Sequence, residues 1–144
     1  MNWQDDVRNL LPLSGRVAPD AGLPAGPGAY ALMIRLGRPV DIPWKGGARR
    51  FSAGRYIYAG SARGPGGIRA RVNRHLRRDK TVHWHVDHLT TVADRIDVLA
   101  IEGGTECAIV AALLTSGVCR VVLKGFGSSD CRDCLSHLLA WEGD

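Results

Sequence analysis

Residues 54–78 constrain the fold most, because they join a strand, a tight turn and a helix in one short stretch. Tyr56–Tyr58 are strand-favouring residues, and Gly60–Gly67 is dense in the glycine and proline that form turns. After this turn, the apolar residues recur at the spacing of one helical face, at Ile68, Val72 and Leu76. The sequence therefore predicts a strand that stops at glycine and a helix from about Gly67 to Arg78.

The predicted helix is strongly basic. Residues 66–80 carry one acid, Asp79, and the cations Arg69, Arg71, Arg74, Arg77, Arg78 and Lys80. This window has a net charge of +5, which is also the net charge of the whole chain, so the other residues sum to zero. A basic helix on an otherwise neutral domain is typical of proteins that bind the nucleic-acid backbone. On charge alone, a plain solvated helix face is an equally good interpretation.

Length and composition are those of one globular domain. The chain has 144 residues, of which 45% are hydrophobic and 23% charged, so it can bury a core and is not disordered as a whole. No apolar run approaches the about 20 residues of a membrane helix, and Met1–Asp6 is acidic rather than basic as in a signal peptide. We therefore expect a soluble, cytoplasmic protein with no membrane partner.

The first confident strand is Gly28–Leu36, which is almost continuously apolar and is therefore predicted to be central and covered on both faces. The two-residue repeat places Tyr30, Leu32, Ile34 and Leu36 on one face. A small hairpin near residues 40–52 separates this strand from Gly54–Gly60, so the two strands should pair antiparallel. Residues 1–27 are expected to form an N-terminal arm with a short amphipathic helix, and residues 28–144 a single domain.

A third strand is predicted at Ile96–Ile101 and a helix over residues 104–114. Thr105 can cap this helix, and Glu106 then lies in its first turn, where the helix dipole favours a carboxylate. Residues 82–89 fit a helix or a strand, residues 119–124 fit a short strand, and residues 135–141 fit a strand or a short helix. We predict an α+β fold with a small central antiparallel sheet flanked by helices. The sheet has three core strands, an inserted hairpin and a C-terminal extension.

The four cysteines are Cys107, Cys119, Cys131 and Cys134. In a reducing compartment, free thiols are the default interpretation. Cys131 and Cys134, followed by His137, nevertheless have the spacing of metal ligands, and His83, His85 and His88 are candidate further ligands. Because structural zinc requires four ligands, one Cys-x-x-Cys pair without a second pair is a weak zinc signal.

Four motifs in order resemble the GIY-YIG nuclease superfamily: Gly28-Ala-Tyr30, Tyr58-Ala-Gly60, Arg71-x-x-x-His75 and Glu106. Within it, the chain is most similar to a branch of small uncharacterised proteins, domain of unknown function family 123, some of which are fused to endonuclease III-type repair enzymes. Further matching segments are Gly54–Ala62, Trp84–Asp87, Thr105–Cys107, Gly125–Cys131 and Ser136–Leu138. The resemblance implies a three-stranded antiparallel sheet flanked by helices and metal-dependent hydrolysis of nucleic-acid phosphodiesters.

The resemblance also implies residue roles. Glu106 matches a metal-binding glutamate, for which Mg²⁺ or Mn²⁺ is the expected ion. Arg71 matches an arginine on the scissile phosphate. Tyr30 and Tyr58 match the motif tyrosines, one of which orients or deprotonates water. His75 shares a helix face with Arg71 and could accept a proton at neutral pH more easily than a tyrosine.

The remaining expected contacts are supporting ones. Many members of the superfamily carry a late asparagine near the site, for which the candidates in this chain are Ser128, Asp130 and His137. The expected nucleic-acid-binding residues are Arg63, Arg69, Arg74, Arg77, Arg78 and Lys80.

Three functional hypotheses follow. The first is a Mg²⁺-dependent endonuclease acting on DNA in repair or processing, with a repair protein as partner. The second is a nucleic-acid-binding module without catalysis. The third is a small protein stabilised by zinc at Cys131, Cys134 and His137. The nuclease hypothesis requires Tyr30, Tyr58, Arg71, His75 and Glu106 to meet on one solvent-open concave face.

Overall fold

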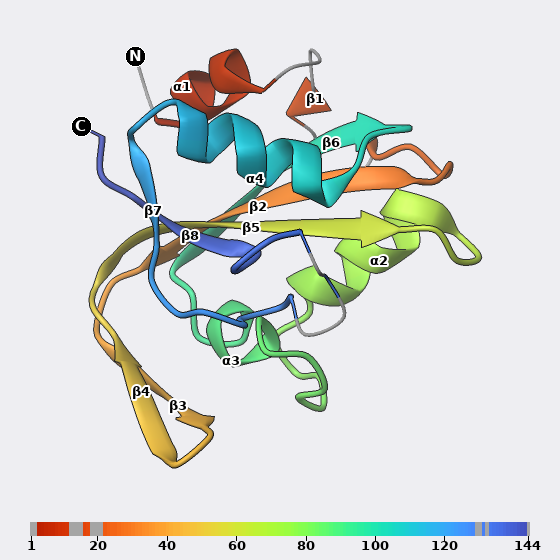
Figure 1. The fold of residues 1–144 in the computed structure, drawn as a ribbon. Helices are drawn as coiled ribbons and strands as arrows, with labels where there is room; N and C mark the ends of the chain where they lie inside the picture. The colour runs from red at the N-terminus through yellow and green to blue at the C-terminus, as the bar shows by residue number, and fades with distance from the viewer. Residues whose placement is uncertain (1–2, 12–15, 18–21, 129–130, 132, 144) are drawn as a thin grey trace.

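In the computed structural model, which describes residues 3–11, 16–17, 22–128, 131 and 133–143, the chain forms an antiparallel sheet with helices on both faces (Figure 1). The six strands lie in the order β1 (Arg16–Val17), β6 (Arg95–Glu102), β2 (Gly28–Leu36), β5 (Gly54–Ala62), β8 (Leu138–Trp141) and β7 (Cys119–Val121). A separate hairpin consists of β3 (Val40–Trp44) and β4 (Gly47–Phe51). The predicted α+β class, with its three core strands, inserted hairpin and C-terminal extension, is confirmed.

Strand β2 is the centre of the sheet. It pairs with β5 along its whole length, from Gly28 opposite Ala62 to Leu36 opposite Gly54, and with β6 on its other edge. Every residue of β2 except Arg35 is buried, as expected of a strand covered on both faces. The register sets Tyr30 directly opposite Gly60, a pairing that matters for the site described below.

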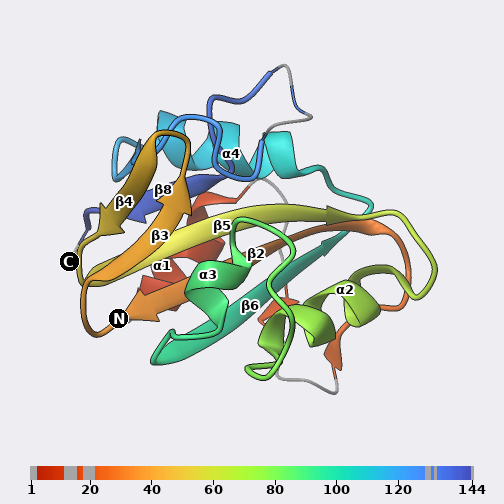
Figure 2. The ribbon, with the colours of Figure 1, turned by 90° about the horizontal axis from the view of Figure 1, so that it is seen from below.

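Two cores lie on opposite faces of this sheet. Tyr30, Leu32 and Ile34 point to the face covered by α2 (Gly67–Leu76), α3 (Asp87–Thr90) and the β3–β4 hairpin, whereas Ala29, Ala31 and Met33 point to the other. The second face is covered by α1 (Trp3–Leu10) and α4 (Glu106–Thr115). Figure 1 shows α1 and α4 above the sheet and α2 and α3 below it, and Figure 2 views the molecule from the α2 and α3 side. The predicted two-residue alternation is confirmed.

The helix ends follow from local chemistry. Helix α2 starts after Gly66, whose left-handed φ of 82° suits glycine. It ends at Leu76, earlier than the predicted Arg78, because Arg77 already has an extended backbone. Helix α4 starts at Glu106, and the Thr105 side chain accepts a hydrogen bond from the Ala108 N–H at 3.2 Å, which confirms the predicted cap.

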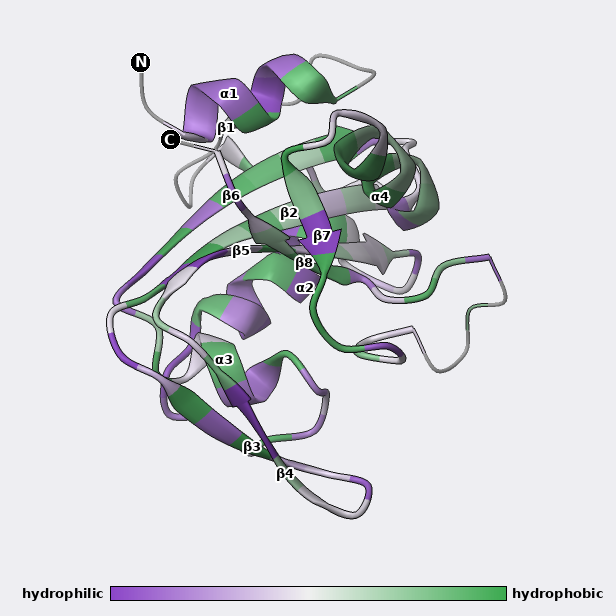
Figure 3. Cartoon of the chain, turned by 60° about the vertical axis from the view of Figure 1, so that its left-hand side comes forward, coloured by the Kyte–Doolittle hydropathy of each residue, from purple (hydrophilic) through white to green (hydrophobic). Residues whose placement is uncertain are grey.

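The structure also decides between helix and strand for residues 82–89 and 135–141, which the sequence left open. Residues 82–86 form irregular chain leading into the short helix α3, and residues 138–141 form strand β8. Helix α4 is apolar around most of its circumference, whereas α1 is amphipathic, as Figure 3 shows. Trp3 and Val7 of α1 add to the core on the α4 face. Among the described residues, every helix is too short or too polar to cross a membrane.

Candidate functional site

An open cleft of about 740 Å³ lies where strand β5 loses its outer partner. Strand β8 pairs with β5 from Tyr56 to Tyr58, and the Ala59 N–H donates to the His137 carbonyl at 2.8 Å. Beyond that point, Gly60 and Ser61 line the cleft. Because the edge of the sheet is open here, side chains from both of its faces can reach the same space.

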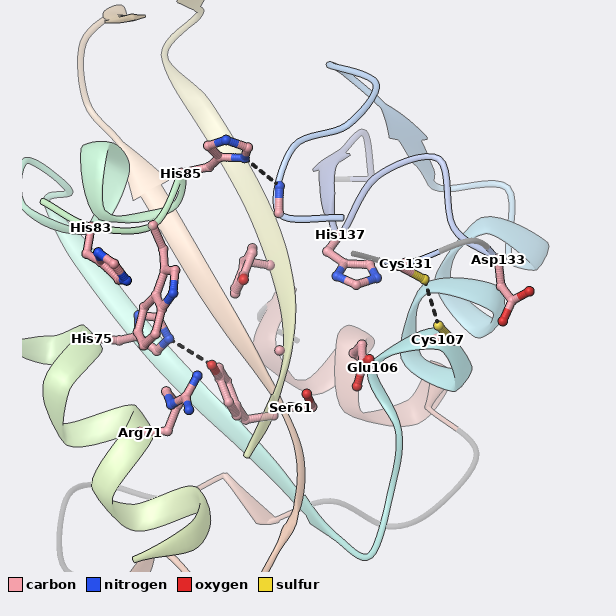
Figure 4. Close-up of a pocket in the computed structure, with 15 residues that line it drawn as sticks. Ser61, Arg71, His75, His83, His85, Glu106, Cys107, Cys131, Asp133 and His137 are labelled. Carbon is pink, nitrogen blue, oxygen red and sulfur yellow. Dashed lines mark hydrogen bonds between the residues drawn. The ribbon is translucent and has the colours of Figure 1, made fainter. Parts of the chain in front are cut away.

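The cleft has two walls, which Figure 4 shows on either side of Ser61. The α2 wall consists of Arg71, His75, His83 and Trp84, and the α4 wall consists of Glu106, Cys107, Cys131, Asp133 and His137. Tyr30 and Tyr58 also line the cleft. The five side chains expected to meet, Tyr30, Tyr58, Arg71, His75 and Glu106, therefore line one solvent-open cleft, as expected.

Tyr30 is fixed by a glycine and a histidine. Its ring lies across Gly60, so closely that a β-carbon at that position would overlap the phenol. Its hydroxyl is 2.7 Å from His75 Nε2. Burial, reinforced by the neighbouring Tyr58, raises the pKa of Tyr30 far above its ordinary value, so the phenol stays protonated.

Tyr58 is held in a similar way on the next strand. A β-carbon at Gly127, which has a left-handed φ of 67°, would be 2.7 Å from the Tyr58 ring, so glycine is required there for two reasons. Burial raises the pKa of Tyr58 to about 12. Neither cleft tyrosine is therefore ionised at neutral pH in the metal-free site.

Asp87 is the buried hub of the α2 wall, meaning the carboxylate behind its lining residues to which the surrounding polar groups bond. Its fully buried carboxylate accepts two hydrogen bonds from Arg74, at 3.0 and 2.9 Å, and two more from the backbone N–H groups of His83 and Trp84. The ammonium of Lys80 lies 3.7 Å away. Burial would raise the pKa of Asp87, but these hydrogen bonds outweigh it and hold the pKa well below its usual range.

His75 lies between Asp87 and Tyr30. Its Nδ1 is 4.0 Å from Asp87 Oδ1, and its Nε2 faces the Tyr30 hydroxyl. The separation from Asp87 is too long for a hydrogen bond, and His75 Nδ1 is buried without a hydrogen-bond partner among the described residues. Which of Tyr30 and His75 donates in their hydrogen bond therefore follows the imidazole tautomer. Burial, followed by the nearby Lys80 charge, lowers the pKa of His75 to about 3. Burial thus removes the advantage expected of His75 as a proton acceptor at neutral pH.

Trp84 makes cation–π contacts with two arginines. The guanidinium carbons of Arg71 and Arg74 lie 4.6 and 4.1 Å from its ring centre. The half-buried indole packs against the core and also lines the cleft. Arg71 is held by this contact with its charge facing the cleft (Figure 4).

Glu106 is the carboxylate of the α4 wall that begins helix α4. As the first residue of α4 it lies at the positive end of the helix dipole. One of its carboxylate oxygens, Oε2, is buried and has no hydrogen-bond partner among the described residues. An unpartnered buried carboxylate oxygen that lines an open cleft can accept a cation or a water.

Behind Glu106 lies a cluster of potential metal ligands, Cys107, Cys131, Cys134 and His137, whose donor atoms are all within 4.8 Å of one another. Cys107 is the member that the sequence did not pick out, since it lies far along the chain from the Cys-x-x-Cys pair. His83, His85 and His88, the ligands considered for the fourth position, are not part of the cluster. His85 instead accepts a hydrogen bond from the Gly127 N–H at Nδ1.

The predicted backbone-binding cations fall into two groups. Four make contacts within the protein: Arg74 and Lys80 face Asp87, and the exposed Arg69 and Arg78 donate to the Leu23 and Ala93 carbonyls. Arg63 and Arg77 are exposed. A second groove of about 670 Å³ shares His83 and Trp84 with the cleft and is lined by Arg74, Arg77 and Lys80.

Of the supporting candidates, His137 lines the cleft and Ser128 does not. Ser128 is buried and donates to the Leu135 carbonyl at 3.2 Å, so it holds the loop before β8. Asp130 lies outside the described residues. The sequence reasoning missed Asp87 as the hub of the α2 wall, although its position three residues after Trp84, at the start of a helix, was a usable signal for a capping carboxylate.

Fold and cleft together define a small α+β domain with a polar site at the open edge of its sheet. Residues 29–144 match the family described as domain of unknown function DUF123, and the chain belongs to this family. No curated protein and no solved structure matches the chain.

Proposed function

We propose that this protein is a divalent-metal-dependent endonuclease that hydrolyses DNA phosphodiester bonds, as the resemblance of its motifs to GIY-YIG nucleases suggests. The observation that carries the proposal is the meeting of Tyr30, Tyr58, Arg71, His75 and Glu106 in one open cleft. These residues come from β2, β5, α2 and α4, so ordinary packing of a single element does not account for their meeting. A role in DNA repair or processing, with a repair protein as partner, is part of the same proposal.

Arg71 has the chemistry to bind the scissile phosphate. It faces the cleft and is braced against Trp84, so less side-chain freedom is lost when it binds. A guanidinium grips two phosphoryl oxygens and neutralises the charge that builds on them during attack by water.

Glu106 is suited to hold the metal. The unpartnered Oε2 supplies an anionic oxygen ligand at the cleft, and Mg²⁺ needs few protein ligands because it retains several waters. When bound there, Mg²⁺ or Mn²⁺ supplies positive charge to the phosphoryl group and acidifies water. The thiols and imidazole of the cluster behind Glu106 are too soft for Mg²⁺, which leaves Glu106 as its anchor.

The tyrosines position water rather than ionise. The Tyr30 hydroxyl is fixed by its hydrogen bond to His75 Nε2, and the hydrogen-bonding capacity left on its oxygen can orient a water molecule. Tyr58, with a pKa of about 12, also stays protonated and acts as a second hydrogen-bonding group.

The second groove supports a polymer rather than a small substrate. It shares His83 and Trp84 with the cleft and is lined by Arg74, Arg77 and Lys80 together with Asp79, so a strand whose phosphate sits at Arg71 could extend along it.

Binding without hydrolysis is the second candidate function. It is favoured by the weakness of the proton acceptors in the cleft, since burial, the largest cause in each case, raises the pKa of both phenols and lowers the pKa of His75 to about 3. The two candidates differ in turnover and share the salt-sensitive binding expected of phosphate contacts.

The distinguishing experiment incubates the pure protein with plasmid, flap and single-stranded DNA, with and without Mg²⁺. The nuclease proposal expects Mg²⁺-dependent cutting by wild type and by Arg38→Ala, which removes an exposed arginine outside the cleft. Arg71→Ala should cut at least about 100-fold more slowly, a loss of about 2.7 kcal/mol of transition-state stabilisation. Binding without cutting under all conditions would favour the second candidate, and equal cutting by Arg71→Ala would contradict the proposed role of Arg71.

A further inference from the structure

We infer that Cys107, Cys131, Cys134 and His137 bind one zinc ion in a closed structural site beside the cleft. The inference is independent of the proposed nuclease activity, because it depends on these four side chains alone. The sequence singled out Cys131, Cys134 and His137 as an incomplete set, and the fold supplies the missing ligand from the first turn of α4.

The sulfur positions fit a mononuclear tetrahedral ion. Cys107 Sγ is 3.5 Å from Cys131 Sγ and 3.2 Å from Cys134 Sγ. Zinc–sulfur bonds of about 2.3 Å at tetrahedral angles separate two sulfurs by about 3.8 Å, so the thiols need to move apart by only a few tenths of an ångström. All four donor atoms lie within 4.8 Å of one another, which is compact enough for one ion to reach each of them.

The imidazole of His137 points to the same conclusion from a different observation. The residue is 6% exposed, and its Nε2 is buried without a hydrogen-bond partner among the described residues. This unpartnered nitrogen belongs to a ring whose donor atom lies within 4.8 Å of three thiols, so it is available to the same ion.

Zinc is the ion that this donor set selects. Three thiols and an imidazole are soft ligands, which exclude Mg²⁺ and Ca²⁺ and favour zinc. Four protein ligands leave no open coordination position for a substrate, so the site is structural rather than catalytic. The cysteines are free thiols, and the sulfur separations are far longer than a disulfide bond.

The ion would cross-link the segments that form the α4 wall of the cleft. It would join the start of α4 through Cys107 to the loop that carries Cys131 and Cys134, and to His137 just before β8. Cys107 directly follows Glu106, so the same ion would fix the backbone from which the Glu106 carboxylate projects.

The test measures zinc in the intact chain after purification without added metal or chelator. Wild type should carry about one zinc per chain, and Cys107→Ser should lose at least about nine-tenths of it, since a three-ligand site holds zinc far less well. Cys119→Ala is the matched control, because Cys119 is a buried thiol outside the cluster and its removal should leave the zinc content unchanged. Zinc-free wild type, or full zinc content in Cys107→Ser, would overturn the inference.

Cobalt substitution tests the ligand set without relying on a variant that folds. Zinc-depleted wild type reconstituted with Co²⁺ should develop the visible absorption of a tetrahedral thiolate site, and added zinc should abolish it. A pale octahedral Co²⁺ spectrum, or a disulfide among these cysteines in freshly purified protein, would contradict the site. Neither measurement involves DNA, so failure here and failure of the nuclease proposal are separate results.

Discussion

The two walls of the cleft differ in how completely their polar groups are paired. Beside the α2 wall, the Asp87 carboxylate has no exposed surface and is paired with Arg74 and Lys80, and His75 contacts Tyr30, although His75 Nδ1 is buried without a hydrogen-bond partner among the described residues. In the α4 wall, Glu106 Oε2 and His137 Nε2 are buried without a partner among the described residues, and three thiols face one another.

This difference assigns different tasks to the two walls. Buried polar groups are normally satisfied, so the Asp87 carboxylate, which accepts four hydrogen bonds, needs no further partner, whereas the unpaired carboxylate oxygen, imidazole nitrogen and thiols of the α4 wall can be completed by cations. We propose that the α2 wall positions phosphate and water, whereas the α4 wall holds zinc at the three thiols and His137 and holds Mg²⁺ at Glu106.

The largest effect should come from breaking the hub of the α2 wall. Asp87→Asn leaves Arg74 and Lys80 close together without their counter-charge, and the free energy of unfolding should fall by about 3 kcal/mol or more. Urea denaturation measures the change. Asp79→Asn, at an exposed position on the same segment, should stay within about 0.5 kcal/mol of wild type. An equal, small effect of both variants would show that the network is not a rigid hub.

The next largest effect on stability should come from substituting Gly60, against which the Tyr30 ring packs. Gly60→Ala places a methyl group where the Tyr30 ring lies, so it should cost about 2 kcal/mol and displace the hydroxyl from His75. Gly64→Ala is the matched control, because a β-carbon there meets open space and the substitution should be neutral or slightly stabilising. Thermal unfolding of both variants provides the comparison, and a neutral Gly60→Ala would contradict the close approach of the ring.

Much of this arrangement could be predicted from residue patterns, and some could not. The alternation in Gly28–Leu36 predicts which side chains share a face with Tyr30, and Thr105 predicts the helix start that places Glu106. The sequence cannot show that Gly60 stands opposite Tyr30, because register is set by pairing across the hairpin.

The proposed zinc ligands illustrate a second feature that could not be predicted from the sequence alone. Cys107 lies 24 residues from Cys131 and 27 from Cys134, and the contact depends on how the last loop returns to α4. Local spacing therefore finds the Cys131–Cys134 pair and misses its partner. In the same way, the charge of residues 66–80 indicates a phosphate-binding helix, but only the fold separates the exposed Arg77 from Arg74, which neutralises Asp87.

A smaller effect should appear in the pH dependence of stability. The pKa of His75 is about 3 in the folded protein and about 6.5 when unfolded, so the unfolded state binds more protons between these values and stability falls as the pH falls. From about pH 7.5 to 5.5, His75 should contribute a loss of about 1 kcal/mol.

His75→Gln should remove that part of the pH dependence, whereas His88→Gln, which alters a histidine outside the cleft lining, should retain it. Urea denaturation at the two pH values gives the comparison. Burial also lowers the pKa of His85 and His137, so some pH dependence should remain in every variant. Identical slopes for wild type and His75→Gln would contradict a neutral, buried His75.

The smallest effect tests the exposed cations beside the α2 wall. Removing Arg63 and Arg77 together should weaken binding to duplex DNA and make the log–log salt dependence shallower by about 2, since each phosphate contact contributes about 0.9. The control replaces Arg38 and Arg49, which are exposed and lie outside the cleft and the second groove. Fluorescence anisotropy at several salt concentrations measures the slopes, and equal slopes for the two double variants would place the DNA path elsewhere.

The most direct test of the central claim is a single-turnover comparison of Glu106→Gln with Glu102→Gln, using labelled DNA and Mg²⁺. Glu102 is exposed at the end of β6 and lies outside the cleft lining, so the two variants differ in whether they remove the proposed metal ligand. Wild type and Glu102→Gln should cut at similar rates, and Glu106→Gln should cut at least about 100-fold more slowly. Equal cutting by Glu106→Gln and wild type, or no cutting by wild type on any substrate, would contradict the account.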